Sequence, residues 1–201
     1  MMILLVTGGI GSGKSEVCRI LRDSGYIFQY NADMRAKALY EEHPTLLADI
    51  ENSLGCCFRD DEGRFQPSRL ASVIFSDRSA LEKVESHLFP AMLEDFNDFA
   101  RKSGGDVVVF ESATVLEKPQ FEGFADKVIL VDAPFEVRLA RACRRDGTDR
   151  DRVLARMQNQ KLMNELSEGY VDPRIDYIIL NDGSLEDLEC RTKIAINSLI
   201  Q

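Results

Sequence analysis

The stretch that decides the fold is Gly8-Gly9-Ile10-Gly11-Ser12-Gly13-Lys14-Ser15, near the start of a chain of 201 residues. It matches the pattern G-x-x-x-x-G-K-[S/T] at every fixed position. The apolar run Met2–Val6 predicts a buried strand before it, and helical spacing of apolar residues over Ser15–Ser24 predicts a helix after it. A glycine-rich loop between a strand and a helix is typical of a phosphate-binding loop, or P-loop.

Each residue type in this loop suits the binding of phosphate. Glycine lets the backbone curl so that its N–H groups point at phosphate oxygens, and the start of the helix adds partial positive charge. Lys14 is predicted to reach the β- and γ-phosphates of ATP, and the Ser15 hydroxyl is predicted to hold Mg²⁺. The predicted nucleotide-binding residues of this segment are Gly9, Ile10, Gly11, Ser12, Gly13, Lys14, Ser15 and Glu16.

Strands and helices alternate along the rest of the chain, a pattern that predicts an α/β fold of the P-loop NTPase type with a five-stranded parallel sheet flanked by helices. The further predicted strands are Tyr26–Tyr30, Val107–Phe110, Lys127–Val131 and Ile175–Leu180. The further predicted helices are Pro134–Arg145, Asp149–Leu162 and Ser184–Leu199.

Residues 34–105 interrupt this alternation. They are mostly helical in pattern, and they separate two strands by more chain than a simple crossover needs. We expect them to form a helical subdomain that binds the acceptor substrate, inserted in a nucleotide-binding core of residues 1–33 and 106–201. Residues 138–165, within the core segment, are a candidate lid.

Composition and charge narrow the class of protein. Apolar residues make up 44% of the chain, enough for a sizeable core, and the net charge of −9 disfavours nucleic acid and anionic membranes as partners. No run of 18 apolar residues is present, and the start of the chain lacks the features of a signal peptide. Five cysteines at irregular spacing indicate reduced thiols. We therefore expect a cytoplasmic protein.

Residues 138–156 carry seven arginines and three aspartates, a local net charge of +4 in an acidic chain. Arg141 and Arg145 are four residues apart and share a helix face, and Arg156 follows in the next predicted helix. Arginine's planar fork suits phosphate oxygens, so this segment predicts phosphate contacts. The alternative is a solvated helix surface with internal salt bridges.

Three carboxylates follow predicted strands. Asp33 comes after the second strand, where it could accept or orient the acceptor proton, or could instead cap a helix. Glu111 ends the third strand and is a candidate Mg²⁺ ligand of the Walker B type. Glu117, in the following loop, is either a further functional acid or a surface charge.

These features favour a small-molecule kinase over a switch GTPase. No [NT]KxD motif is present, and Asp60-Asp61-Glu62-Gly63, which fits DxxG, lies in a polar turn and does not follow an apolar strand. A kinase needs a carboxylate near the acceptor hydroxyl and mobile cations over the transferred phosphoryl group, as Asp33 and the arginines could provide.

Together these residues resemble one known family, dephospho-CoA kinase. The matching segments, in chain order, are Thr7–Ser15 (TGGIGSGKS), Asn31-Ala32-Asp33, Val131–Pro134 (VDAP), Arg141–Asp146 (R-x-x-x-R-D), Arg156–Gln160 (R-x-x-x-Q) and Asn181–Leu188 (NDGSLEDL). They extend over nearly the whole chain and are more specific together than the phosphate loop alone.

The resemblance implies that ATP phosphorylates the ribose 3′-hydroxyl of dephospho-CoA, giving coenzyme A and ADP in the last step of coenzyme A biosynthesis. It implies that Asp33 is the catalytic carboxylate and that Lys14 and Ser15 serve the phosphates and the metal. It also implies that Arg141, Arg145 and Arg156 are lid and nucleotide contacts, with Arg141 and Arg145 catalytic. Two other hypotheses are a kinase for another small acceptor, such as a nucleoside monophosphate or shikimate, and a nucleotide-binding module without catalysis.

Three positions depart from the family pattern. Asn31 and Glu111 stand where the family usually has aspartate, and Phe89-Pro90 stands where it usually has histidine-proline. The departures affect the acceptor side and the lid more than the phosphate loop, which matches fully.

Overall fold

The computed structural model describes residues 1–25 and 27–200 of the chain. The chain divides into two compact units by its internal contacts. The first unit comprises Met1–Asn31 and Ser103–Gln201, and the second comprises Ala32–Lys102.

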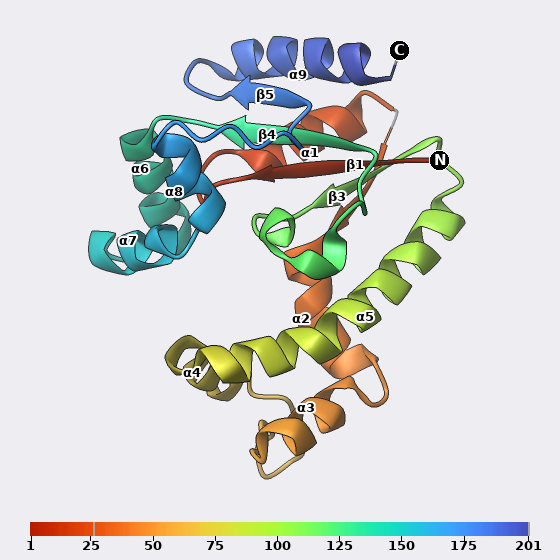
Figure 1. Cartoon of the computed structure of the whole chain (residues 1–201), viewed down its shortest axis with the longest axis vertical. Helices are drawn as coiled ribbons and strands as arrows, with labels where there is room; N and C mark the ends of the chain where they lie inside the picture. The colour runs from red at the N-terminus through yellow and green to blue at the C-terminus, as the bar shows by residue number, and fades with distance from the viewer. Residues whose placement is uncertain (26, 201) are drawn as a thin grey trace. The chain divides into compact units, whose positions relative to one another are not determined.

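The first unit contains a five-stranded sheet (Figure 1). Its strands are β1 (Met2–Gly8), β2 (Ile27–Asn31), β3 (Val107–Glu111), β4 (Lys127–Asp132) and β5 (Tyr177–Leu180). They lie in the order β2-β3-β1-β4-β5, and all four neighbouring pairs are parallel. The predicted parallel sheet is therefore confirmed. The predicted second strand began at Tyr26, which lies outside the described residues, and the last strand begins two residues later than predicted.

One face of this sheet is covered by two helices that pack side by side, α1 (Lys14–Asp23) and α9 (Leu185–Leu199). The central strands are apolar on both faces, as expected for a parallel sheet buried between layers. The main core lies between the sheet and these helices. Its buried residues include Val6, Val109 and Val131 from the strands, with Val17 and Leu21 from α1 and Leu188 and Ala195 from α9.

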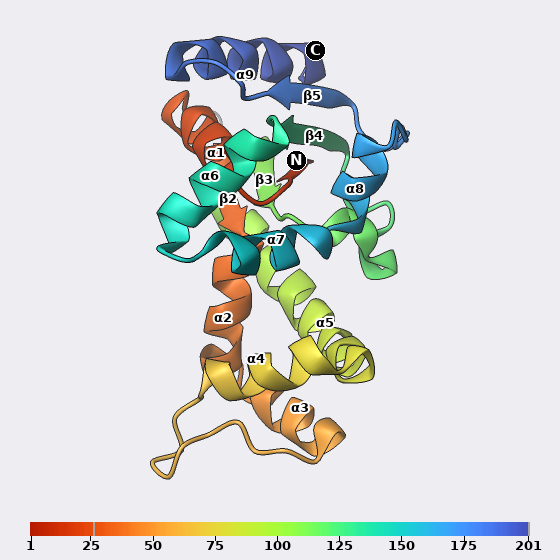
Figure 2. The same ribbon diagram turned by 90° about the vertical axis from the view of Figure 1, so that its left-hand side faces the viewer.

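Three helices follow β4 in the chain, α6 (Phe135–Asp146), α7 (Arg150–Gln158) and α8 (Lys161–Ser167), seen together in Figure 2. The prediction of one helix over Asp149–Leu162 was wrong, because α7 ends at Gln158 and α8 begins at Lys161. The backbone of Gln160 is not helical (φ −90°, ψ 87°). Its side chain accepts a hydrogen bond from Ile10 N–H at 2.8 Å, a tertiary contact that helix periodicity does not encode.

Two short 3₁₀ helices, η1 (Val115–Glu117) and η2 (Pro119–Phe121), follow β3 in the first unit. Near them, Phe110 packs edge-on against Phe124 with ring centroids 5.0 Å apart, which gives the second face of the sheet an aromatic cluster of its own.

The second unit is mostly helical. It contains α2 (Ala32–Glu42), α3 (Leu46–Leu54), α4 (Pro67–Ser76) and most of α5 (Arg78–Ser103). Arg35 on α2 donates two hydrogen bonds to Asp95 on α5, at 2.9 and 2.8 Å, and so joins the first and last helices of the unit. Among the helices of residues 1–25 and 27–200, none combines the length and the apolar character needed to cross a bilayer.

The N-terminus of α9 supplies a test of the fold. Ser184 Oγ accepts a hydrogen bond from Asp187 N–H at 3.1 Å, and the Asp187 carboxylate accepts one from Ser184 N–H at 2.9 Å, forming a capping box. We expect Ser184→Ala to lower the free energy of unfolding by about 1 kcal/mol, measured by urea denaturation. The control is Ser198→Ala on the same helix, whose hydroxyl bonds only to the helix's own backbone. A change below about 0.5 kcal/mol is expected there, and equal losses in both variants would contradict the role of the cap.

Candidate active site

The phosphate loop joins β1, which ends at Gly8, to α1, which begins at Lys14. Gly11 and Gly13 adopt the left-handed backbone conformation, with φ of +76° and +98°. Ser12 N–H donates to the Gly9 carbonyl at 3.1 Å and closes a turn inside the loop. The first backbone N–H groups of α1 lack partners within the helix, so this helix start can receive an anion.

The glycines are also needed because other segments lie directly against the loop. A Cβ on Gly11 would lie 2.1 Å from the Arg138 carbonyl oxygen, and one on Gly13 would lie 2.1 Å from Asn181 Nδ2. The positions of these glycines are therefore set both by backbone conformation and by close packing against α6 and the residue after β5.

Two side chains hold the loop by hydrogen bonds. Asn181 Nδ2 donates to the Ser12 carbonyl at 2.8 Å, and Gln160 Oε1 accepts from Ile10 N–H at 2.8 Å. Asn181 and Gln160 are both buried, so these bonds form away from water, where an unpaired backbone group is costly. Both residues occur in the motifs quoted above, but a motif does not state which backbone group its side chain contacts.

Arg138 is a loop neighbour that the predicted contacts left out. It is 7% exposed, its Nε donates to the Ala133 carbonyl at 3.0 Å, and its guanidinium lies against Gly9. Burial lowers the pKa of Arg138, and the nearby Asp132 carboxylate opposes this shift. The side chain remains a cation beside the phosphate loop. Its inclusion in the arginine-rich segment was the only signal in the sequence.

Lys14 lies across the loop that precedes it. Its Nζ donates to the carbonyls of Gly8 and Gly9, at 2.8 and 3.1 Å. Neutral carbonyls hold the ammonium in place without removing its charge, so it can still attract phosphate oxygens.

Ser15 and Glu111 meet beside the loop. Ser15 Oγ donates to Glu111 Oε1 at 2.6 Å, and the carboxylate is buried at 4% exposure. A hydroxyl and a carboxylate are oxygen ligands of the kind that Mg²⁺ prefers, and Mg²⁺ usually binds one or two protein groups together with water and nucleotide phosphates. Within the described part of the chain, no group of three or more His, Cys, Asp or Glu side chains is arranged to hold a metal by itself. The donor set therefore fits a Mg²⁺ ion that arrives with a nucleotide.

Two departures from the family pattern contact each other at this place. Asn31 Nδ2 donates to Glu111 Oε2 at 2.7 Å, and Gln29 Nε2 donates to the same oxygen at 2.7 Å. Nothing in the sequence predicted a contact from Gln29.

The three predicted lid arginines have protein partners. Arg145 and Arg156 both bind Asp146, at 2.7 and 2.6 Å, whereas Arg141 donates to the carbonyl of Asn181 at 3.1 Å. Arg145 and Arg156 are exposed, with 60% and 49% of their side-chain surface accessible. Their hydrogen bonds, Arg145 first, lower the pKa of Asp146 to about 2.

Two other predicted residues lie at the surface. Glu16 is paired with Arg19 on the exposed side of α1, at 2.7 Å. Asp33 belongs to the second unit, where it is exposed in the first turn of α2. It is the second residue of this helix, so it lies inside the helix and does not occupy its N-cap position.

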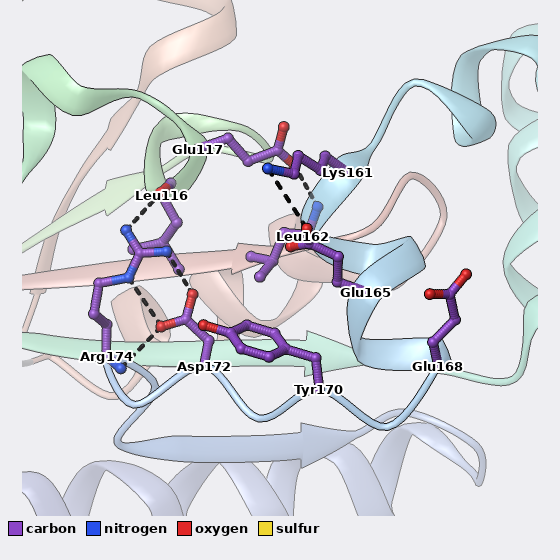
Figure 3. Close-up of a pocket in the computed structure, with 9 residues that line it drawn as sticks. All are labelled: Leu116, Glu117, Lys161, Leu162, Glu165, Glu168, Tyr170, Asp172 and Arg174. Carbon is purple, nitrogen blue, oxygen red and sulfur yellow. Dashed lines mark hydrogen bonds and ion pairs between the residues drawn. The ribbon is translucent and has the colours of Figure 1, made fainter.

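Glu117 lines a pocket of about 600 Å³ in the first unit, shown in Figure 3. It accepts a hydrogen bond from Leu162 N–H at 2.9 Å and thereby joins η1 to the start of α8. Arg174, in the same pocket, is paired with the buried Asp172 and donates to the Leu116 carbonyl. Four acids and two basic residues line the pocket, so its charge disfavours a phosphate ligand.

Comparison with known proteins identifies the family. The family model described as dephospho-CoA kinase matches residues 2–187. The chain belongs to the dephospho-CoA kinase family. The predicted family is confirmed, and with it the interpretation as a kinase.

Two curated relatives show how far this similarity extends. The dephospho-CoA kinase of Porphyromonas gingivalis is 36% identical over 172 residues, covering 86% of this chain and 84% of the relative. That of Salinibacter ruber is 33% identical over 191 residues, covering 94% and 92%.

Solved structures support the same fold. The crystal structure of TT1252 from Thermus thermophilus superposes with a TM-score of 0.83 at 30% identity, covering 100% of this chain and 98% of that one. Dephospho-CoA kinase from Campylobacter jejuni gives a TM-score of 0.63 at 22% identity, covering 98% and 96%. Shikimate kinase from Bacteroides thetaiotaomicron, at 14% identity and a TM-score of 0.56, shares the P-loop kinase fold, covering 100% of this chain and 99% of that one.

The close packing around Gly11 predicts that adding a methyl group at this position weakens nucleotide binding. Gly11→Ala combines a left-handed backbone with a clash against the Arg138 carbonyl, so the loop must move. We expect its affinity for ADP to fall at least tenfold, measured by calorimetry, which corresponds to about 1.4 kcal/mol.

The control for this variant is Gly123→Ala. Gly123 also has a positive φ, +68°, but a Cβ there meets no atom within 4 Å. Both variants carry a backbone cost of about 1–2 kcal/mol in stability, and only Gly11→Ala should lose ADP. Equal ADP affinity in the two variants would show that the packing against α6 does not shape the loop.

The ion pairs of Asp146 predict a dependence of kinase stability on pH. The pKa of Asp146 is lowered from 3.8 to about 2 in the folded protein, so the carboxylate stabilises the folded state above about pH 4. This contribution is lost as the pH falls toward 2. We expect Asp146→Asn to lower the free energy of unfolding at pH 6 and to differ less from wild type at pH 3, measured by urea denaturation. The control is Asp151→Asn, because Asp151 is exposed. A difference in stability between Asp146→Asn and the wild type that does not change with pH would contradict the assignment.

Proposed function

We propose that this protein is an ATP-dependent kinase that phosphorylates the ribose 3′-hydroxyl of dephospho-CoA, giving coenzyme A and ADP in the last step of coenzyme A biosynthesis. One structural observation carries the proposal. Asn181, the first residue of the closing motif, donates a hydrogen bond to Ser12 in the phosphate loop. The first and last motifs of the sequence resemblance thus meet at the phosphate loop.

The phosphate loop binds the nucleotide in this proposal. Backbone N–H groups of the loop and of the start of α1 face the phosphates in this proposal, and Lys14 contacts the β- and γ-phosphates. The N–H groups of Ile10 and Ser12 are excepted, because they donate to Gln160 and to the Gly9 carbonyl. Glu16 is also proposed to contact the nucleotide, although its side chain is paired with Arg19 and its backbone N–H donates to the Gly13 carbonyl at 3.0 Å, so one of these contacts must be exchanged on binding. The positive charge that the loop presents comes from Lys14 and the buried Arg138 together.

Ser15 and Glu111 are the proposed metal residues. A bound Mg²⁺ would shield the charge of the phosphates. Glu111 supplies a carboxylate in a fixed orientation, and Ser15 can turn its hydroxyl from the carboxylate to a metal, because a hydroxyl has both a proton and lone pairs.

Arg141, Arg145 and Arg156 are the proposed cations over the transferred phosphoryl group, within a lid of residues 138–165. The ion pairs of Arg145 and Arg156 with Asp146 are exposed, and such pairs contribute only about 0–1 kcal/mol. These arginines can therefore exchange Asp146 for a phosphate at small cost. Closing such a lid would exclude water that otherwise hydrolyses ATP.

Asp33 is the proposed catalytic carboxylate, and residues 34–105 are the proposed acceptor-binding subdomain within a core of residues 1–33 and 106–201. Asp33 is exposed in the first turn of α2, so its carboxylate is accessible to an acceptor hydroxyl. It would accept the proton of that hydroxyl or orient it. We place the protein in the cytoplasm, with small-molecule substrates and without nucleic acid as a partner.

The direct test measures ADP release with ATP and Mg²⁺, comparing dephospho-CoA with AMP, CMP and shikimate as acceptors. We expect release that depends on dephospho-CoA alone. Turnover with another acceptor and none with dephospho-CoA would favour a different small-molecule P-loop kinase. Binding of ATP without turnover on any acceptor would favour a nucleotide-binding module.

Asp33→Asn tests the catalytic carboxylate. We expect kcat to fall about 100-fold or more while the affinity for ATP stays within about threefold, since general-base contributions are of this size. Asp49→Asn is the matched control, because Asp49 is also an exposed acid in the first turn of a helix of the second unit. If both variants keep wild-type kcat, Asp33 has no catalytic role.

A further inference from the structure

Glu111 is a buried carboxylate whose two oxygens have different partners. Its Oε1 accepts the hydrogen bond from Ser15 on α1 at 2.6 Å, and its Oε2 accepts from Gln29 and Asn31 on β2, each at 2.7 Å. A buried carboxylate is costly unless it is hydrogen-bonded, so these donors decide where it lies.

Strand register explains why the two amides reach the same oxygen. β2 and β3 are parallel neighbours, with Asn31 opposite Glu111 and Gln29 opposite Val109. Residues two apart on a strand point to the same face, so both amides and the carboxylate share one face of the sheet. Val109 on this face packs in the core with α1, the helix that carries Ser15.

Side chains of β2 and β3 alternate between the two faces of the sheet, and aromatic ones lie on the opposite face. Tyr30, between the two amides, stacks on Phe110 with ring centroids 5.2 Å apart. The apolar face thus fixes the two strands against each other, and the polar face places the amides beside Glu111.

The chemistry of the donors is also specific. An amide presents N–H groups without charge, so two of them can surround one carboxylate oxygen without neutralising the carboxylate. The reversed orientation of either amide would place its carbonyl oxygen 2.7 Å from a carboxylate oxygen, which is repulsive. An aspartate at position 31 would bring a second negative charge against Glu111.

We propose that Gln29 and Asn31 are positioning residues: as a neutral amide clamp they fix Glu111 Oε2, so that Oε1 stays beside Ser15 to complete the metal site of a nucleotide complex. This inference rests on the proposed function, because that function implies a bound metal–nucleotide complex. It assigns Asn31 a role different from that of a second acid beside Asp33.

The test measures binding of Mn²⁺, a probe for Mg²⁺, by electron paramagnetic resonance with saturating ADP and no acceptor. Gln29→Ala removes one donor, and we expect the affinity for Mn²⁺ to fall about tenfold, because hydrogen bonds to charged groups are worth that much. Asn31→Asp removes a donor and adds a like charge, and we expect a larger loss. ADP affinity in the presence of a chelator should stay within about twofold of wild type in both variants.

Two further variants separate positioning from general damage. Asn197→Asp adds the same charge at an exposed position of α9 in the same unit and should bind Mn²⁺ as wild type does. Asn31→Gln keeps a neutral amide on this face of β2, and it should lose less affinity for Mn²⁺ than Asn31→Asp does. Thermal melting checks that each variant folds, and Gln29→Ala carries the test if Asn31→Asp does not.

Wild-type affinity for Mn²⁺ in both Gln29→Ala and Asn31→Asp would overturn the proposal. The outcome is independent of the acceptor. A wild-type protein that binds Mn²⁺ with ADP but fails to phosphorylate dephospho-CoA would refute the proposed function, while losses of Mn²⁺ affinity in the variants would still support the clamp.

Discussion

The close approach of other backbone and side-chain atoms to the phosphate loop is the constraint on which the nucleotide-binding unit depends. When some N–H groups of a loop turn toward phosphate, its carbonyl groups and its remaining N–H groups still need hydrogen-bond partners. Asn181 and Gln160 provide them at Ser12 and Ile10, from segments more than 145 residues away in the chain. The segment after β5 and the segment between α7 and α8 therefore stabilise the conformation of the loop, which links the site to the fold around it.

The charged side chains around the loop differ in the kind of partner that holds them. Lys14 donates to neutral carbonyls, and Glu111 accepts from neutral amides and a hydroxyl, so these contacts do not neutralise either charge. Arg145 and Arg156, in contrast, share one carboxylate in exposed ion pairs that are easily exchanged. Fixed groups near the loop and exchangeable groups on α6 and α7 are a suitable division for phosphoryl transfer, in which part of the site must be rigid and part must close.

Several features of the site could not be predicted because they depend on which segments meet in space. Periodicity treated Asp149–Leu162 as one helix, whereas Gln160 leaves the helix to bind Ile10. Arg138 was one of seven similar arginines in the sequence, and only its burial against Gly9 distinguishes it. Gln29 gave no signal, since an amide in a strand has no meaning until the neighbouring strand and its register are known.

The sequence by itself determined the class of fold, the phosphate loop and the family, because these depend on local patterns: a strand, a glycine loop, a helix and short motifs in a fixed order. It also selected Lys14 and Ser15 by the loop motif, and Asp33 and Glu111 by their places relative to predicted strands. Only the tertiary structure decided the partners: that Asn31 and Gln29 hold Glu111, and that Asn181 holds Ser12. The physical reason is that a hydrogen bond depends on a separation of about 3 Å in space, which distance along the chain does not specify.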